Sequence, residues 1–191
     1  MNIAGTDYCS QYKAYEVYVA GCTIKCPACH NPELQDFNIG TPYKDWITDK
    51  LPTLRTLDKS LVDKIFIVGG EPLDQPPEEL DHLIDVLKAN TDCEIWLFTG
   101  RDDPKVFDGP WFKQGKLKGE NKLHVIKVGP YDPKWPPYKS IDSSGFELPS
   151  GNQQLFRFIM PVKAQPEPQP SVQHEDIQLE TIISETLDRT Q

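Results

Sequence analysis

The strongest constraint on this chain is a group of three cysteines, Cys22, Cys26 and Cys29, within eight residues. The spacing C-x₃-C-x₂-C places three thiols on one tight loop. Three thiolates can hold three irons of a cubic [4Fe–4S] cluster and leave the fourth iron without a protein ligand. An iron with an open position can bind a small molecule, so such a cluster can take part in chemistry as well as carry electrons.

Structural zinc is the main alternative for these cysteines. Zinc prefers four protein ligands, which usually come from two separated pairs, whereas this chain has a single group. His30 directly follows Cys29, and adjacent residues rarely reach one ion without strain. A disulfide framework is disfavoured because the five cysteines are an odd number in a long chain. Cluster ligands, zinc ligands and incidental thiols remain as interpretations, and Cys9 and Cys93 are interpreted as unligated.

Length and charge limit the class of protein. A chain of 191 residues predicts one domain with a tail. The net charge of -9 argues against general nucleic-acid binding, which needs a basic surface. No apolar run approaches the ~18 residues of a membrane-spanning helix, and the N-terminus lacks the features of a secretory signal. We therefore expect a cytoplasmic protein that binds neither membrane nor nucleic acid.

Apolar patterning predicts a parallel sheet. A strand at 15–19 alternates in polarity and runs directly into the cysteine loop. Short continuous apolar runs, which suit strands covered on both faces, follow further along the chain. The further predicted strands are Lys64–Val68, Glu94–Phe98, Leu123–Val128 and Leu155–Ile159.

Two helices are predicted between these strands. Thr41 is expected to cap a helix that has Pro42 at its first position and extends to about Leu51. Pro77 is expected to begin a second helix with an acidic first turn. The second helix carries an apolar stripe at i, i+3, i+4 and i+7, formed by Leu80, Leu83, Ile84 and Leu87.

The order of strands and helices predicts an α/β fold with right-handed crossovers. Ligands of such folds bind at the carboxyl ends of the strands. The cysteine loop and the turns at 69–72, 99–100 and 129–130 each follow a predicted strand. We therefore expect them to meet at one edge of the sheet.

Composition changes mark the less regular segments. Polar residues at 101–121 and prolines at 130–151 predict irregular connections. From Lys163 a proline-rich stretch begins, which predicts an extended linker. The sequence therefore predicts a core domain at 1–162 and a linker with an acidic tail at 163–191. The tail is expected to be either disordered or a short docking helix at about 175–189.

A second motif, Gly69-Gly70-Glu71-Pro72, follows the predicted strand at 64–68. Glycines let a backbone approach a ligand closely, and a carboxylate can accept a hydrogen bond from an ammonium group. Together with the cysteine spacing, this motif resembles the radical S-adenosylmethionine (SAM) superfamily. The resemblance implies a partial, open (β/α) barrel with mostly parallel strands.

The resemblance narrows to the activating proteins of anaerobic (class III) ribonucleotide reductase. It rests on Gly21-Cys22, Cys26-Pro-Ala-Cys29 and Asn31-Pro-Glu33 in the cluster loop. Phe66–Leu73, Leu97–Gly100, Val128–Tyr131 and Ser150–Gln153 resemble later elements of that group. Together these segments cover about residues 15–158.

The resemblance implies cofactors and site residues. A [4Fe–4S] cluster would chelate SAM through its open iron, and the glycine-rich loop would hold the SAM amino group. Thr99 and Gly100 would lie near the methionine or the ribose, and Asn152 is a further candidate. The implied metal ligands are Cys22, Cys26 and Cys29, and the implied cofactor-binding residues are Gly69, Gly70, Glu71, Thr99, Gly100 and Asn152.

The resemblance also implies a reaction and partners. The activity would be reductive SAM cleavage, followed by formation of a glycyl radical on the large subunit of anaerobic ribonucleotide reductase. The electron donor would be a flavodoxin- or ferredoxin-type protein. One alternative is a small-molecule enzyme such as 7-carboxy-7-deazaguanine synthase, although Ala28 stands where that family usually has an aromatic residue. Another alternative is a non-catalytic zinc-binding adaptor.

Overall fold

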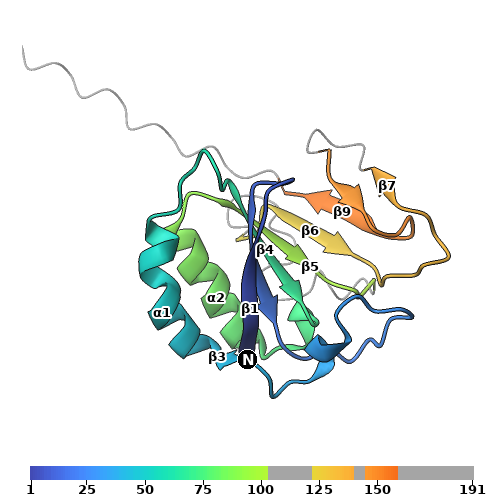
Figure 1. Ribbon diagram of the computed structural model, residues 1–191, viewed down its shortest axis with the longest axis horizontal. Helices are drawn as coiled ribbons and strands as arrows, with labels where there is room; N and C mark the ends of the chain where they lie inside the picture. The colour runs from blue at the N-terminus through green and yellow to red at the C-terminus, as the bar shows by residue number, and fades with distance from the viewer. Residues whose placement is uncertain (103–121, 140–144, 159–191) are drawn as a thin grey trace, which may run out of the picture. The chain divides into compact units, whose positions relative to one another are not determined.

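The computed structural model describes residues 1–102, 122–139 and 145–158. Most of the predicted irregular connection at 101–121 and all of the predicted tail at 163–191 lie outside these residues. The main sheet has seven strands in the order β3-β1-β2-β4-β5-β6-β9 (Figure 1). Their bounds are β1 (Asn2–Cys9), β2 (Ala14–Val19), β3 (Thr41–Pro42), β4 (Lys64–Gly69), β5 (Glu94–Phe98), β6 (Val125–Val128) and β9 (Gln154–Arg157).

The other elements are two α-helices, two short 3₁₀ helices and a second, two-stranded sheet. Figure 1 shows α1 and α2 side by side on one face of the main sheet. Within the described residues, no helix is both long enough and apolar enough to span a membrane. The bounds are α1 (Tyr43–Arg55), α2 (Pro77–Asn90), η1 (Pro32–Gln35), η2 (Pro72–Asp74), β7 (Tyr138–Lys139) and β8 (Glu147–Leu148).

The centre of the sheet confirms the predicted α/β class. Strands β2, β4, β5 and β6 pair in parallel, and α1 and α2 connect the first three of them. The edges differ from the prediction, because β1 pairs with β2, β3 with β1 and β9 with β6 in antiparallel fashion. Among the described residues the result is a mixed, open sheet with β3 and β9 at its edges.

The predicted start of the first helix is wrong. Thr41 and Pro42 form β3, which pairs with Ile3 and Asn2 of β1. Pro42 stands at the N-cap position without a side-chain capping hydrogen bond, so Thr41 does not cap the helix and Pro42 is not its first residue. Pro42 has an extended backbone (φ -50°, ψ 132°) and suits an edge strand because it has no N–H to donate. The helix begins at Tyr43 and runs four residues beyond the predicted end at Leu51, to Arg55, with Pro52 inside it.

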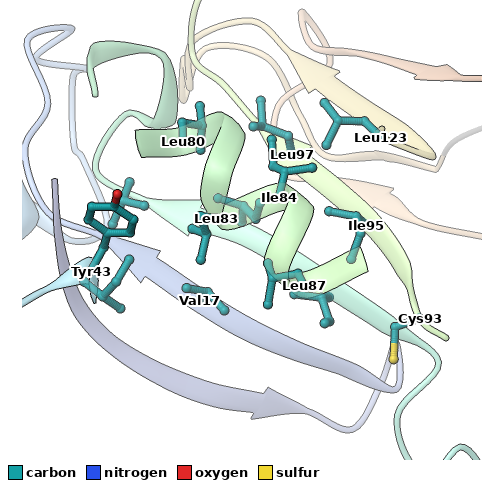
Figure 2. Close-up of a cluster of buried hydrophobic side chains, with 14 of the residues drawn as sticks. Val17, Tyr43, Leu80, Leu83, Ile84, Leu87, Cys93, Ile95, Leu97 and Leu123 are labelled. Carbon is teal, nitrogen blue, oxygen red and sulfur yellow. The ribbon is translucent and has the colours of Figure 1, made fainter. Parts of the chain in front are cut away.

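The two faces of the sheet are covered differently. On one face α1 and α2 pack against the strands, and the predicted stripe of α2 is fully buried, with 0% exposure for each of its four residues. Figure 2 shows Leu83, Ile84 and Leu87 of this stripe in one cluster of buried side chains with Val17 of β2 and with Ile95 and Leu97 of β5. On the opposite face an aromatic cluster contains Phe66, Trp96 and Phe146. That opposite face also carries the candidate site.

Candidate functional site

The carboxyl ends of the parallel strands meet at one cavity, as the sequence predicts. The cavity has a volume of about 310 Å³ and is lined by the cysteine loop and by residues that follow β4, β5 and β6. His30 of the cysteine loop contacts Tyr131, which follows β6, with 4.5 Å between the ring centroids. The cysteine loop therefore reaches across the cavity from β2 to the far side of the parallel sheet.

The cysteine loop begins in a turn that requires glycine. Gly21 has φ +96°, and a Cβ there would lie 2.1 Å from the ring of Phe37. Its N–H donates to the carbonyl of Leu34 at 2.8 Å, and the N–H of Cys22 donates to the carbonyl of Gln35 at 3.3 Å. The loop then folds back along η1, which keeps its first cysteine beside the end of β4.

All three predicted metal ligands line this cavity. Cys22, Cys26 and Cys29 are free, partly buried thiols. Lys25 and Ala28, which precede the second and third cysteines, both have φ 53°, a left-handed conformation that non-glycine residues seldom adopt. Backbone strain of this kind occurs most often at ligand sites.

The thiols fit a cluster in number, type and place. Three cysteines that line one cavity are the donor set of an iron–sulfur cluster with an open iron. No three His, Cys, Asp or Glu side chains of the described segments are gathered closely enough to hold a single metal ion. The thiolates of a [4Fe–4S] cluster each bind a different iron, so they need not converge on one point.

The first cysteine lies in surroundings that disfavour a thiolate. Burial raises the pKa of the Cys22 thiol, and the backbone amides of Ile24 and Lys25 act in the opposite direction. A thiol must lose its proton to bind a metal. The positive charge of the bound metal therefore has to stabilise the thiolate at this position.

Glu71 is a buried residue of the Gly69–Glu71 loop, which is predicted to bind SAM and is called the predicted SAM loop below. Its Oε1 accepts hydrogen bonds from the N–H of Leu73 (2.9 Å) and the hydroxyl of Thr99 (2.6 Å). Its Oε2 accepts from the N–H of Gly100 at 2.8 Å. Burial raises the pKa of this carboxyl, while the three donors oppose that shift. Glu71 thus joins the loop after β4 to the end of β5.

These contacts bring five of the predicted cofactor-binding residues together. Gly69, Gly70, Glu71, Thr99 and Gly100 all line the cavity. A carboxylate has about four acceptor positions, of which Glu71 uses three within the described residues. Within this part of the chain, one acceptor position of Glu71 is therefore unfilled.

The two glycines of this loop allow close packing between loops. Gly69 has φ +110°, and a Cβ at Gly70 would lie 2.3 Å from the carbonyl oxygen of Gly21. The N–H of Glu71 donates to the same carbonyl at 2.8 Å. The glycines thus hold the predicted SAM loop against the start of the cysteine loop, whereas the sequence predicts that they approach a ligand.

Lys127 is a charged residue of the cavity that the sequence analysis does not single out. Its side chain is buried (9% exposed), and its Nζ donates to the carbonyl of Gly129 at 3.3 Å. Burial lowers the pKa of this ammonium to about 8. The available signal is one lysine in the otherwise apolar run Val125–Val128, where alternation places it on the face opposite Ile126.

Gln153 also lines the cavity, although the sequence analysis selects its neighbour Asn152. Gln153 is 4% exposed, its Nε2 donates to the carbonyl of Gly129 at 3.1 Å, and its Oε1 has no hydrogen-bond partner within the described structure. Asn152 does not line the cavity, and its Nδ2 donates to the carbonyl of Pro130 at 3.0 Å. A buried acceptor without a partner is costly, which indicates that Gln153 faces a ligand or water.

A comparison with protein families matches the part of the chain that carries the cysteine loop. The family described as "4Fe-4S single cluster domain" matches residues 13–116, more than half of the chain. The chain belongs to this family. The match contains the whole cysteine loop and the Gly69–Glu71 loop, so the family assignment covers two of the motifs that meet at the cavity.

Individual relatives agree with the resemblance found in the sequence. The anaerobic ribonucleoside-triphosphate reductase-activating proteins of Salmonella typhi and Salmonella typhimurium are each 30% identical to the chain over 89 residues. The protein of the same name from Escherichia coli (strain K12) is 29% identical over 89 residues. Each match covers 44% of this chain and 56% of the relative, so the chain spans just over half the length of these relatives. No solved structure matches the chain.

Proposed function

We propose that this protein is a radical SAM activase for anaerobic ribonucleotide reductase. The observation that carries this proposal is that the cysteine loop and the Gly69–Glu71 loop line one cavity. The similarity to activating proteins supports the same function. The parallel block β2-β4-β5-β6 would form part of an open (β/α) barrel, with the cavity on its inner face.

Cys22, Cys26 and Cys29 would hold a [4Fe–4S] cluster, with one iron left open for SAM. Such a cluster would supply the electron for reductive cleavage of SAM to methionine and a 5′-deoxyadenosyl radical, and a glycine of the partner would then lose a hydrogen atom to this radical. The cysteine loop carries His30 to Tyr131 and so forms one side of the cavity mouth.

The loops after β4 and β5 would bind the SAM amino group. Glu71 has one acceptor position left for an ammonium group, and Thr99 and Gly100 keep its carboxylate in place. The glycines hold this loop against Gly21, close to the first cysteine. The amino group and the open iron would thereby be held at a fixed separation.

The wall formed by β6 and β9 would bind another polar part of the cofactor. Lys127 offers a buried donor and Gln153 a buried acceptor, and both side chains donate to the carbonyl of Gly129. A group that accepts one hydrogen bond and donates another, such as a pair of sugar hydroxyls, would satisfy both residues. Phe98 and Phe146 cover the neighbouring wall and would keep water out.

The substrate would be a protein, the large subunit of anaerobic ribonucleotide reductase. A cavity of about 310 Å³ is far too small to admit a folded domain. The partner would therefore have to present its glycine on an extended segment at the cavity mouth. A flavodoxin- or ferredoxin-type protein would supply the electron.

The experiment is anaerobic reconstitution of the full chain with iron and sulfide, followed by reduction and an assay for 5′-deoxyadenosine from SAM. Wild-type protein should bind a cluster and form deoxyadenosine, whereas Cys26→Ala should do neither. Cys9→Ala is the matched control, because Cys9 is also a free, partly buried thiol but does not line the cavity. Retained cleavage in Cys26→Ala, or zinc without sulfide in the wild type, would contradict the proposal.

A further inference from the structure

Three polar side chains behind the cavity wall join the loops that form it. They are Thr23 of the cysteine loop, Asp74 of η2 and Arg101, which follows β5. Asp74 Oδ2 accepts from the N–H of Thr23 (2.7 Å) and from its hydroxyl (2.8 Å), and Asp74 Oδ1 accepts from Arg101 Nε (3.1 Å). Arg101 Nη2 donates to Asp74 Oδ1 and, at 3.0 Å, to Thr23 Oγ1. We name these three residues the loop clamp.

The loop clamp holds the cysteine loop at its last fixed point. Before it, backbone hydrogen bonds attach Gly21 to Leu34 and Cys22 to Gln35. After it, residues 24–30 make no backbone hydrogen bond to the rest of the described chain outside the loop. Thr23 is therefore the point from which the segment with Cys26 and Cys29 extends into the cavity.

The clamp is held by charge as well as by hydrogen bonds. The Asp74 side chain is only 6% exposed, whereas that of Arg101 is 40% exposed. A carboxylate that is nearly buried is stable only with a charged partner and filled acceptor positions, and Asp74 has both. The same contacts tie together the segments that follow β2, β4 and β5.

We propose that the loop clamp positions the cysteine loop for its metal centre, with Asp74 acting through Thr23 and Arg101 acting through Asp74. This inference rests on the proposed cluster but not on the proposed activase reaction. A loop that carries all three cysteine ligands retains a cluster better when its starting point is fixed. The clamp supplies this fixed point without a direct contact to the metal.

The clamp also sets the charge beside the first cysteine. Cluster thiolates are negative, and the carboxylate of Asp74 adds a further negative charge near Cys22. The guanidinium of Arg101 compensates for it. Replacing Arg101 with an uncharged residue would leave the Asp74 carboxylate uncompensated, so a cluster would be harder to reduce.

Two readouts on the reconstituted full chain separate these roles, namely the rate of cluster loss to an iron chelator and the reduction potential. Thr23→Val removes the hydroxyl contacts but keeps the backbone N–H, and it should speed cluster loss about tenfold, which corresponds to about 1.4 kcal/mol. Thr23→Ser should restore the wild-type rate. Arg101→Lys keeps the charge and should change mainly the rate, whereas Arg101→Met should also make the potential more negative.

The control is Lys122→Met, which removes the ion pairs that another partly exposed cation makes with Asp81 and Asp85 of α2. It should leave both the rate and the potential unchanged. Wild-type rates of cluster loss in Thr23→Val and Arg101→Met, or a wild-type chain that assembles no cluster, would overturn the inference. The rate of cluster loss and the reduction potential are both measured without SAM and without the partner. A wild type that holds a cluster but fails to cleave SAM in the separate cleavage assay would therefore contradict the activase proposal and leave this inference standing.

Discussion

Lys127→Met should stabilise the protein while it impairs the site. Burial lowers the pKa of Lys127 from 10.5 to about 8, and each pKa unit corresponds to about 1.4 kcal/mol. The charged lysine therefore costs the native state about 3 kcal/mol at neutral pH. Methionine has a similar length and no charge, so it should recover most of this free energy without leaving a large cavity.

The pH dependence gives the sign of this effect. Between pH 8 and about 10.5 the unfolded chain binds the proton of Lys127 more tightly than the folded chain does. The free energy of unfolding of the wild type should therefore rise with pH across this window, and the full penalty should be present below pH 8. Lys127→Met should lack this rise.

The assay is urea unfolding of the reduced, cluster-free full chain at pH 7 and pH 10, followed by tryptophan fluorescence. Lys134→Met is the control, because Lys134 is exposed and no burial penalty is relieved there. A Lys127→Met variant that is less stable than the wild type at pH 7, or that keeps the wild-type rise between pH 8 and pH 10, would refute the reasoning. If the residue serves the cofactor, the same variant should bind SAM more weakly despite its greater stability.

Two further predictions concern the backbone of the site and a buried histidine. Gly70→Ala should lower the free energy of unfolding by about 1–3 kcal/mol and weaken cluster retention, because its Cβ would lie 2.3 Å from the Gly21 carbonyl oxygen. Gly5→Ala is the control, because a Cβ at Gly5 meets nothing within 4 Å. Equal effects of the two substitutions would contradict the argument. Burial lowers the pKa of His124, whose Nδ1 accepts from the N–H of Ile95, so wild-type stability should fall as pH drops through about 6.5. His124→Gln should flatten this fall in urea unfolding between pH 7 and pH 5, and an unchanged slope would show that another group titrates there.

The central strands and the place of the site were predictable because their signals are local. The apolar runs of β4 and β5 are buried on both faces, so composition alone marks them. The motifs that follow them share one edge because parallel strands all point the same way. Strand β1, which lies between β2 and the short edge strand β3, lacks such a signal, because only Ile3 of its eight residues is buried.

The details of the site depend on contacts that are distant in sequence. Glu71 has donors from Thr99 and Gly100, and no local pattern indicates that most of its acceptor positions are filled within the protein. The same applies to Asp74 and Arg101 of the loop clamp, which are separated by 27 positions. Thr41-Pro42 has the composition of a helix start, but tertiary pairing with β1 overrides that local preference.

The measurement that tests the central claim most directly is electron paramagnetic resonance of the reconstituted, reduced protein after incubation with SAM and the large subunit of an anaerobic ribonucleotide reductase. The account predicts a glycyl radical doublet on the partner that depends on SAM and is lost with Cys26→Ala. The reductase subunit must first be shown to form the glycyl radical with its own activating protein. If this protein then forms deoxyadenosine but no doublet on that subunit, the result would contradict the activase claim and indicate a small-molecule substrate.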